Sequence, residues 1–125
     1  MIKYLFRAPK FPVICDTPEI LIGAENHDEL EEQIKSLRNF SEEQFSLIDS
    51  SNEGWVLYTD LMVVSPLAFE KVWTKKKVID LFNKSQAAKK LEYEYPMKSI
   101  SSKRFDRIFN EIVLLIKKAN DSIQN

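Results

Sequence analysis

The sequence predicts an α+β domain, with a small antiparallel or mixed sheet formed mostly by residues 2–65 and about three helices packed on it. Two observations lead to this fold class. Short runs rich in β-branched and aromatic residues, separated by turn residues, fill the first half of the chain. Apolar residues at helical spacing fill most of the second half. Residues 1–125 suffice for a single domain, and because strands precede helices we expect the helices on one face of the sheet.

Three strands are predicted before the first helix. Residues 2–7, Ile-Lys-Tyr-Leu-Phe-Arg, favour a strand, and Pro9 and Pro12 then interrupt the chain. Residues 13–15 form a short apolar run of extended type, and a turn leads into a further strand over residues 19–24.

A first helix is predicted over residues 27–39. Asn26 and Glu29 stand three residues apart, which is the spacing of a capping signal, with Asn in place of the usual Ser or Thr. One apolar stripe follows at i, i+4 and i+7: Leu30, Ile34 and Leu37.

A hairpin follows this helix. Residues 45–49 and 55–59 are predicted strands, and Ser-Ser-Asn-Glu-Gly at residues 50–54 supplies the turn between them. Residues 61–64 continue as a strand until Ser65 and Pro66 end it.

Two more helices are predicted after residue 73. The first spans residues 75–84 with Thr74 as its cap, and the last spans residues 102–119 with Ser101 or Ser102 as its cap. Their inward-facing stripes are Val78, Ile79 and Phe82 in the first, and Phe105, Ile108, Phe109, Ile112, Leu115 and Ile116 in the last. Residues 85–100 show no period that predicts a helix or a strand.

Charge is unevenly distributed along the chain, although the formal total is only −1. Residues 16–70 carry 13 acidic and two basic residues, whereas residues 71–125 carry 13 basic and six acidic ones. Two interpretations stay open: the halves fold against each other and their charges cancel, or the asymmetry marks an interaction surface.

The acidic segment provides one candidate binding face, which would attract a basic protein and repel nucleic acid. Its candidate residues are Asp28, Glu29, Glu31, Glu32, Glu42, Glu43, Asp49 and Glu53. A solvated surface without a partner would explain the same residues.

The predicted helix starts provide an alternative anion-binding site, because each hydroxyl cap is followed by cations at the positive end of a helix dipole. Its candidate residues are Trp73, Thr74, Lys75, Lys76, Lys77, Ser102, Lys103 and Arg104. Screening by solvent or by the chain's own acids would also explain these cations.

Most signatures of catalysis are missing from the sequence. It has no glycine-rich phosphate loop and no zinc-binding helix, and Cys15 and His27 are its only cysteine and histidine. We interpret Cys15 as a core residue and His27 as a surface residue rather than as a nucleophile–base pair. The carboxylate pairs Glu42 with Glu43 and Asp49 with Asp60 are unspecific among 19 acids. No cofactor or metal is predicted.

The expected location is the cytoplasm. A lone thiol fits a reducing compartment, and the first residues place charges inside an apolar stretch and lack a signal-peptide core. No apolar run approaches the length of a membrane helix, so no membrane partner is expected.

In size, cytosolic character, missing catalytic residues and acidic segment, the chain resembles the small bacterial immunity proteins that neutralise toxins. Further residues carry this resemblance: Leu47-Ile-Asp, Glu53-Gly-Trp55, Trp73-Thr-Lys and Val78-Ile-Asp-Leu-Phe82. It is a resemblance of type and transfers no residue roles. It implies a non-enzymatic protein-binding module that covers the basic site of a toxin. A binder of nucleic acid or of a phosphate ligand, and an enzyme that uses carboxylates alone, are the alternatives.

Overall fold

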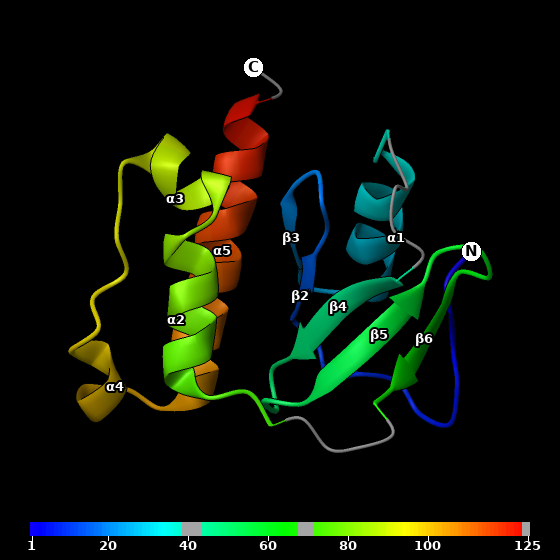
Figure 1. Cartoon of the computed structure of the whole chain (residues 1–125), viewed down its shortest axis with the longest axis horizontal. Coiled ribbons are helices and arrows are strands. Elements are labelled where there is room, and N and C mark those ends of the chain that lie inside the picture. Colours follow the sequence, from blue (N-terminus) through cyan, green and yellow to red (C-terminus); the bar gives the residue numbers. More distant parts are fainter. Residues whose placement is uncertain (39–43, 68–71, 124–125) are drawn as a thin grey trace.

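The computed structural model describes residues 1–38, 44–67 and 72–123, and within them it contains six strands and five helices (Figure 1). The strands are β1 (Lys3–Tyr4), β2 (Val13–Asp16), β3 (Leu21–Ala24), β4 (Gln44–Asp49), β5 (Gly54–Tyr58) and β6 (Val63–Pro66). The helices are α1 (His27–Lys35), α2 (Lys75–Asn83), α3 (Gln86–Leu91), α4 (Ser99–Ser102) and α5 (Phe105–Ile123).

The six strands form one sheet in the order β1-β6-β5-β4-β2-β3. Strands β1 and β6 run parallel, and all other neighbours run antiparallel, which confirms the α+β class with a mixed sheet. The predicted hairpin is confirmed as β4–β5, with Leu47 opposite Trp55. The sheet is larger than predicted, and five helices replace the three expected.

Helices cover both faces of the sheet. On β2, Val13 and Cys15 pack with Leu30 and Ile34 of α1, whereas the intervening Ile14 packs with α2, α3 and α5 on the opposite face. Figure 1 shows α2, α3 and α5 side by side as one layer. The prediction that all helices share one face is therefore wrong. It failed because side chains on both sides of β2 are apolar, and each side needs its own cover.

Helix α5 packs closely on β3. A Cβ atom added at Gly23 would lie 3.0 Å from the carbonyl oxygen of Val113 and 3.4 Å from Ile116. The missing side chain therefore lets the helix backbone approach the strand. The predicted inward stripe of α5 is confirmed for its buried members Ile108, Phe109, Ile112 and Ile116.

Side-chain amides from both helices protect the outer edge of β3. Gln33 of α1 donates a hydrogen bond to the carbonyl oxygen of Gly23 at 2.8 Å. Asn120 of α5 donates one to the carbonyl oxygen of Leu21 at 3.1 Å. Because these carbonyl groups already have donors, this edge offers little to an incoming strand.

Two predicted elements end several residues earlier than expected. The strand predicted over residues 2–7 ends after Tyr4, because Phe6 adopts a left-handed φ of 69° and the Arg7 amide bonds the Leu5 carbonyl oxygen at 2.7 Å. The first helix ends at Lys35 rather than 39, and residue 39 lies outside the described residues.

Helix caps are confirmed at two of the three predicted starts. Asn26 accepts the Glu29 amide at 2.9 Å, and Thr74 accepts the Lys77 amide at 3.2 Å. The third prediction is wrong, because Ser101 and Ser102 belong to the short helix α4. Extended backbone at the following residue (φ −128°, ψ 147°) separates α4 from α5, which begins at residue 105 rather than 102.

Helix α3 lies in the segment that the sequence left unassigned. Ser85 caps it by accepting the Ala88 amide, and Glu92 ends it with a left-handed φ of 50°. Its buried residues Ala87 and Ala88 are too small to produce a marked apolar stripe, so the helical period of this segment is weak in the sequence.

The substitution Gly23→Ala should lower the free energy of unfolding by about 1–3 kcal/mol, because the new methyl group would push against the backbone of α5. Urea denaturation measures the change. The exposed Ser46→Ala on β4 serves as the control and should stay within about 0.5 kcal/mol of the parent. Equal stability of all three proteins would contradict the close approach.

Candidate functional site

An acidic surface forms where α1 meets the C-terminal half of α5. Glu29, Glu32 and Asp121 line one recess of about 240 Å³ there. Glu25 and Asp28 adjoin them, since Glu25 shares a cation with Glu29 and Asp28 lies one turn before Glu32. We call Glu25, Asp28, Glu29, Glu32 and Asp121 the acidic surface. The sequence predicted three of these residues, and the fold adds Glu25 and Asp121.

Lys117 of α5 lies within the acidic surface. Its Nζ is 2.6 Å from a Glu25 oxygen and 2.9 Å from a Glu29 oxygen. Hydrogen bonds to Glu25 and then Glu29 raise the pKa of Lys117, and the hydrogen bond from Lys117 is the largest cause that lowers the pKa of Glu29. One lysine thus ties the two halves of the chain together among several carboxylates.

The remaining predicted acids do not join the acidic surface. Glu31 bonds His27 and the Ile2 amide, Asp49 is buried, and Glu53 pairs with Arg7. Glu42 and Glu43 lie outside the described residues.

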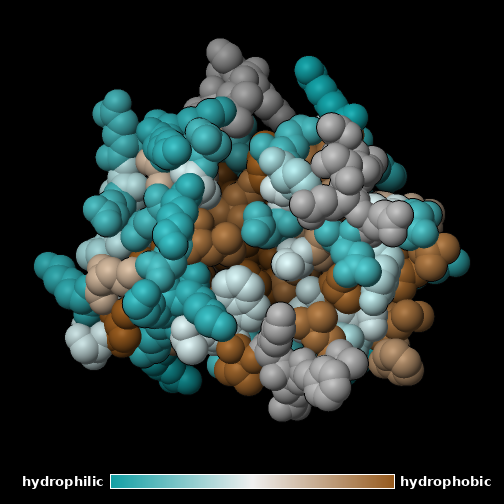
Figure 2. Space-filling model, in the orientation of Figure 1, coloured by the Kyte–Doolittle hydropathy of each residue, from teal (hydrophilic) through white to brown (hydrophobic). Residues whose placement is uncertain are grey.

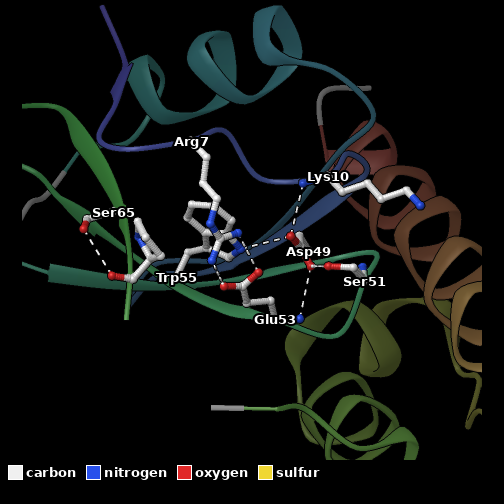
Figure 3. Close-up of polar contacts among 8 residues, drawn as sticks. Arg7, Lys10, Asp49, Ser51, Glu53, Trp55 and Ser65 are labelled. Carbon is white, nitrogen blue, oxygen red and sulfur yellow. Dashed lines mark hydrogen bonds and ion pairs between the residues drawn. The ribbon is translucent and has the colours of Figure 1, made fainter. Parts of the chain in front are cut away.

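Asp49 is a buried acceptor at the turn of the β4–β5 hairpin, with 1% of its surface exposed (Figure 3). Its Oδ1 accepts hydrogen bonds from the Ser51 amide and hydroxyl and from the Glu53 amide, at 2.7–3.1 Å. Its Oδ2 accepts the Lys10 amide at 3.1 Å and the Trp55 Nε1 at 3.0 Å. The carboxylate therefore holds the hairpin turn and the loop after β1 in place.

Arg7 covers the Trp55 ring from the loop after β1. Its guanidinium lies 4.7 Å from the ring centroid and binds both carboxylate oxygens of Glu53 (Figure 3). Cation–π contact and a bidentate ion pair fix the loop that starts with the left-handed Phe6. Phe6 itself projects into solvent with 91% of its surface exposed.

His27 takes part in a polar chain rather than in a pair with Cys15. Its Nδ1 lies 2.7 Å from the Tyr4 hydroxyl and its Nε2 lies 2.8 Å from Glu31. Burial, and then the Glu31 charge, raise the pKa of Tyr4. Cys15 lies fully buried in the core under α1, and burial raises the pKa of its thiol, so both groups keep their protons. The polar contacts of Tyr4, His27 and Glu31 connect β1 to α1.

Of the cations at the start of α2, some are engaged by hydrogen bonds or an ion pair within the protein, and one lines a recess. The Thr74 hydroxyl accepts a hydrogen bond from the Lys77 amide. Lys75 donates to the carbonyl oxygen of Ile100 at 2.9 Å, and Lys76 pairs with Asp80 at 2.7 Å. The Lys77 side chain instead lines a recess with Trp73.

The cations before α5 do not form the predicted cap site. Lys103 pairs with Glu111 at 2.7 Å and lies 5.3 Å from the Tyr95 ring centroid. The hydrogen bond to Glu111 is the largest cause that raises the pKa of Lys103. Arg104 lies 3.8 Å from Asp106 and is largely exposed. Ser102 is separated from α5, so these three residues make no common anion site.

A groove runs between α2 and the sheet. Its main recess, of about 700 Å³, is lined by Val72, Trp73, Lys77, Asp80, Leu81 and Lys84. Trp73 also borders a recess of about 290 Å³ over β4 and β5, and Leu81 and Lys84 border another beside the turn between β2 and β3. Figure 2 shows apolar atoms at the bottom of a hollow in this part of the surface. We call the three recesses the α2 groove.

The sequence pointed to Trp73 and Lys77 but missed the other groove residues. Lys77, Leu81 and Lys84 are spaced at i, i+4 and i+7, so the helical period of the predicted 75–84 helix already placed them on one face.

The sequence offered two unspecific carboxylate pairs, and the structure describes one of them. Asp49 and Asp60 lie at opposite ends of β5, and Glu42 and Glu43 lie outside the described ranges. Within residues 1–38, 44–67 and 72–123, no three His, Cys, Asp or Glu side chains come together as metal ligands. No helix in the same ranges is long and apolar enough to span a membrane.

Charges of the two halves stay largely apart in the fold. Among the described residues, Lys117 is the one cation of residues 71–125 that forms an ion pair with an acid of residues 16–70. The other ion pairs of the second half, such as Lys76–Asp80 and Lys103–Glu111, remain inside it. Few ion pairs of the described residues therefore connect the two halves of the chain, although Asp16 and Glu19 line one recess together with Lys84.

Searches with protein-family models, among curated proteins and among solved structures give no match to this chain.

The substitution Asp49→Ala should lower the free energy of unfolding by about 2–4 kcal/mol, because it leaves buried donors, including the Trp55 Nε1, without their acceptor. Urea denaturation tests this value. Asp60→Ala, which removes an exposed acid beyond the other end of β5, should cost less than about 0.5 kcal/mol. An Asp49 variant as stable as the Asp60 variant would refute the role of Asp49.

The substitution Lys117→Met should destabilise the protein at neutral pH by no more than about 1 kcal/mol. The lowered pKa of Glu29 gives stability that is present above its ordinary value of 4.5 and is lost as the pH falls through the folded value. The raised pKa of Lys117 gives stability that is present below 10.5 and is lost as the pH rises through the folded value. The difference in stability between Lys117→Met and the parent should therefore shrink at both acidic and alkaline pH.

Thermal unfolding across this pH range measures the effect. Lys118→Met, at the exposed neighbouring position, is the matched control and should show no such pH dependence. A difference that stays constant from pH 3 to pH 11 would contradict the ion pairs as its source.

Proposed function

We propose that the chain is a non-enzymatic protein-binding module of the cytoplasm that recognises a basic partner protein through the acidic surface. The observation that carries this proposal is the separation of charge in the fold, where Lys117 alone among the described cations of the second half neutralises acids of the first. A surface with a net negative charge steers an oppositely charged partner and speeds its association.

Two carboxylates of the acidic surface are the best placed for contact. Asp28 and Glu32 are exposed one helical turn apart on α1, and neither forms an ion pair with a described residue. The substrate groove or active site of a basic toxin would supply the complementary charge, so neutralisation of a toxin is the specific form of this function that we propose.

The state of the reactive side chains supports a non-enzymatic role. The single cysteine is buried with a raised thiol pKa, and the single histidine is engaged by Tyr4 and Glu31. Asp49 has five hydrogen-bond donors around it and faces the core. Each group thus serves the fold in a way that leaves little capacity for attack on a substrate.

Charge reversal tests the proposal. A partner is first recovered on the immobilised protein from its native host at low salt, identified, and purified. The double variant Asp28→Lys with Glu32→Lys should then bind this partner at least about tenfold more weakly, and the loss should diminish at high salt. Surface-plasmon resonance measures both effects.

Asp60→Lys, at the exposed turn after β5, is the control and should leave the affinity unchanged. Equal affinity of the double variant and the parent would exclude the acidic surface. Toxicity of the partner alone in cells, relieved by co-expression of the chain, would establish neutralisation. Nucleic acid as the sole retained molecule, released by salt, would instead support the anion-binding alternative.

A further inference from the structure

The α2 groove combines depth with an accessible apolar lining. Val72 keeps 58% of its surface exposed, and the partly buried Trp73 and Leu81 stand beside it in the recess of about 700 Å³. Apolar side chains gathered in a concavity offer a ligand the burial of surface that a flat exposed face does not.

Two lysines border this apolar lining. Lys77 of α2 and Lys84, the C-cap of that helix, are both exposed and lie seven residues apart, which corresponds to about 10.5 Å along the helix axis. Neither forms an ion pair with a residue in the described ranges. Asp80 also lines the recess, but Lys76 already neutralises it at 2.7 Å. The main recess is therefore cationic.

The far end of the groove differs in sign. Asp16 and Glu19 line the recess beside the turn between β2 and β3, where Lys84 and Leu81 form the opposite wall. A ligand that follows the groove thus meets lysines over the main recess and carboxylates beyond Lys84. This change of sign disfavours a uniformly anionic polymer, such as a nucleic acid, along the whole groove.

We propose that the α2 groove binds an extended peptide segment of a protein partner, with two apolar residues between two carboxylates. In an extended polyproline-type segment, side chains three residues apart point the same way at about 9 Å, close to the spacing of Lys77 and Lys84. The apolar residues between the two carboxylates of the peptide provide a side chain that packs on Trp73 and Leu81. This site goes beyond the proposed function, because it uses neither Asp28 nor Glu32.

The test uses a capped synthetic hexapeptide, Gly-Glu-Leu-Phe-Glu-Gly, and the full chain labelled with ¹⁵N. The peptide should shift the Trp73 indole resonance and the amides of α2 with a dissociation constant below about 1 mM. Replacing both glutamates of the peptide by glutamine should weaken binding at least about tenfold, as should the double variant Lys77→Glu with Lys84→Glu.

The matched control is Lys89→Glu with Lys90→Glu, which reverses two exposed lysines of α3 that do not line the groove. This control and the double variant Asp28→Lys with Glu32→Lys should both bind the peptide as the parent does. Peptide binding in the α2 groove would therefore stand even if the acidic surface bound no partner. Partner binding by the acidic surface would likewise stand if the groove bound no peptide.

Three outcomes would overturn the proposal. The first is the lack of any shift in the groove resonances up to about 1 mM peptide. The second is an equal loss of binding in the α3 control, which would indicate general attraction to cations. The third is binding of a ten-nucleotide oligothymidylate, but not of the peptide, at the same resonances, which would assign the groove to nucleic acid.

Discussion

The packing of β3 between α1 and α5 is the interaction on which the rest of the fold depends. All four residues of this strand are buried, and α5 approaches its backbone at Gly23. Gln33 and Asn120 complete the contact by bonding the strand's outer carbonyl groups. Because α1 comes from the first half of the chain and α5 from the second, this strand packs against both halves, and α2 and α3 pack in turn on α5.

The same arrangement explains why opposite charges remain apart. Helix α5 faces the sheet with its apolar stripe and meets α1 only near its C-terminal half, where Lys117 contacts Glu25 and Glu29. Of the lysines of α2, Lys77 lines the groove, Lys76 is exposed and pairs with Asp80, and Lys75 donates to the carbonyl oxygen of Ile100. Burial of apolar surface fixes this geometry, and the charges follow the helices that carry them. Carboxylates therefore gather around α1, and lysines gather around α2.

The sequence predicted elements well where a strong local signal exists. The Asn26 and Thr74 caps, the β4–β5 hairpin and the apolar stripe of α5 all depend on short-range chemistry, and all are present. Small residues hid α3, and the turn at Phe6 depends on Arg7 reaching Glu53, a contact across 46 positions. Long-range contacts of this kind leave no local pattern.

In the candidate site, too, local features were predictable and long-range contacts were not. Asp28, Glu29 and Glu32 were predictable as one helical face, but the burial of Asp49 was not, because an aspartate before a turn is usually exposed. Asp121 and Lys117 join the acidic surface only through the packing of α5 against α1. The face of Lys77, Leu81 and Lys84 was readable from the helical period, whereas its position across from the sheet required the fold.

Cys15 is a natural chemical probe of local opening in this fold. The thiol is the only one in the chain, has no exposed surface, and lies between α1 and the sheet. A thiol-modifying reagent can reach it only when that layer separates, so the modification rate reports the free energy of opening at one defined place in the core. Partner binding to α1 would slow the reaction in proportion to the stability it adds.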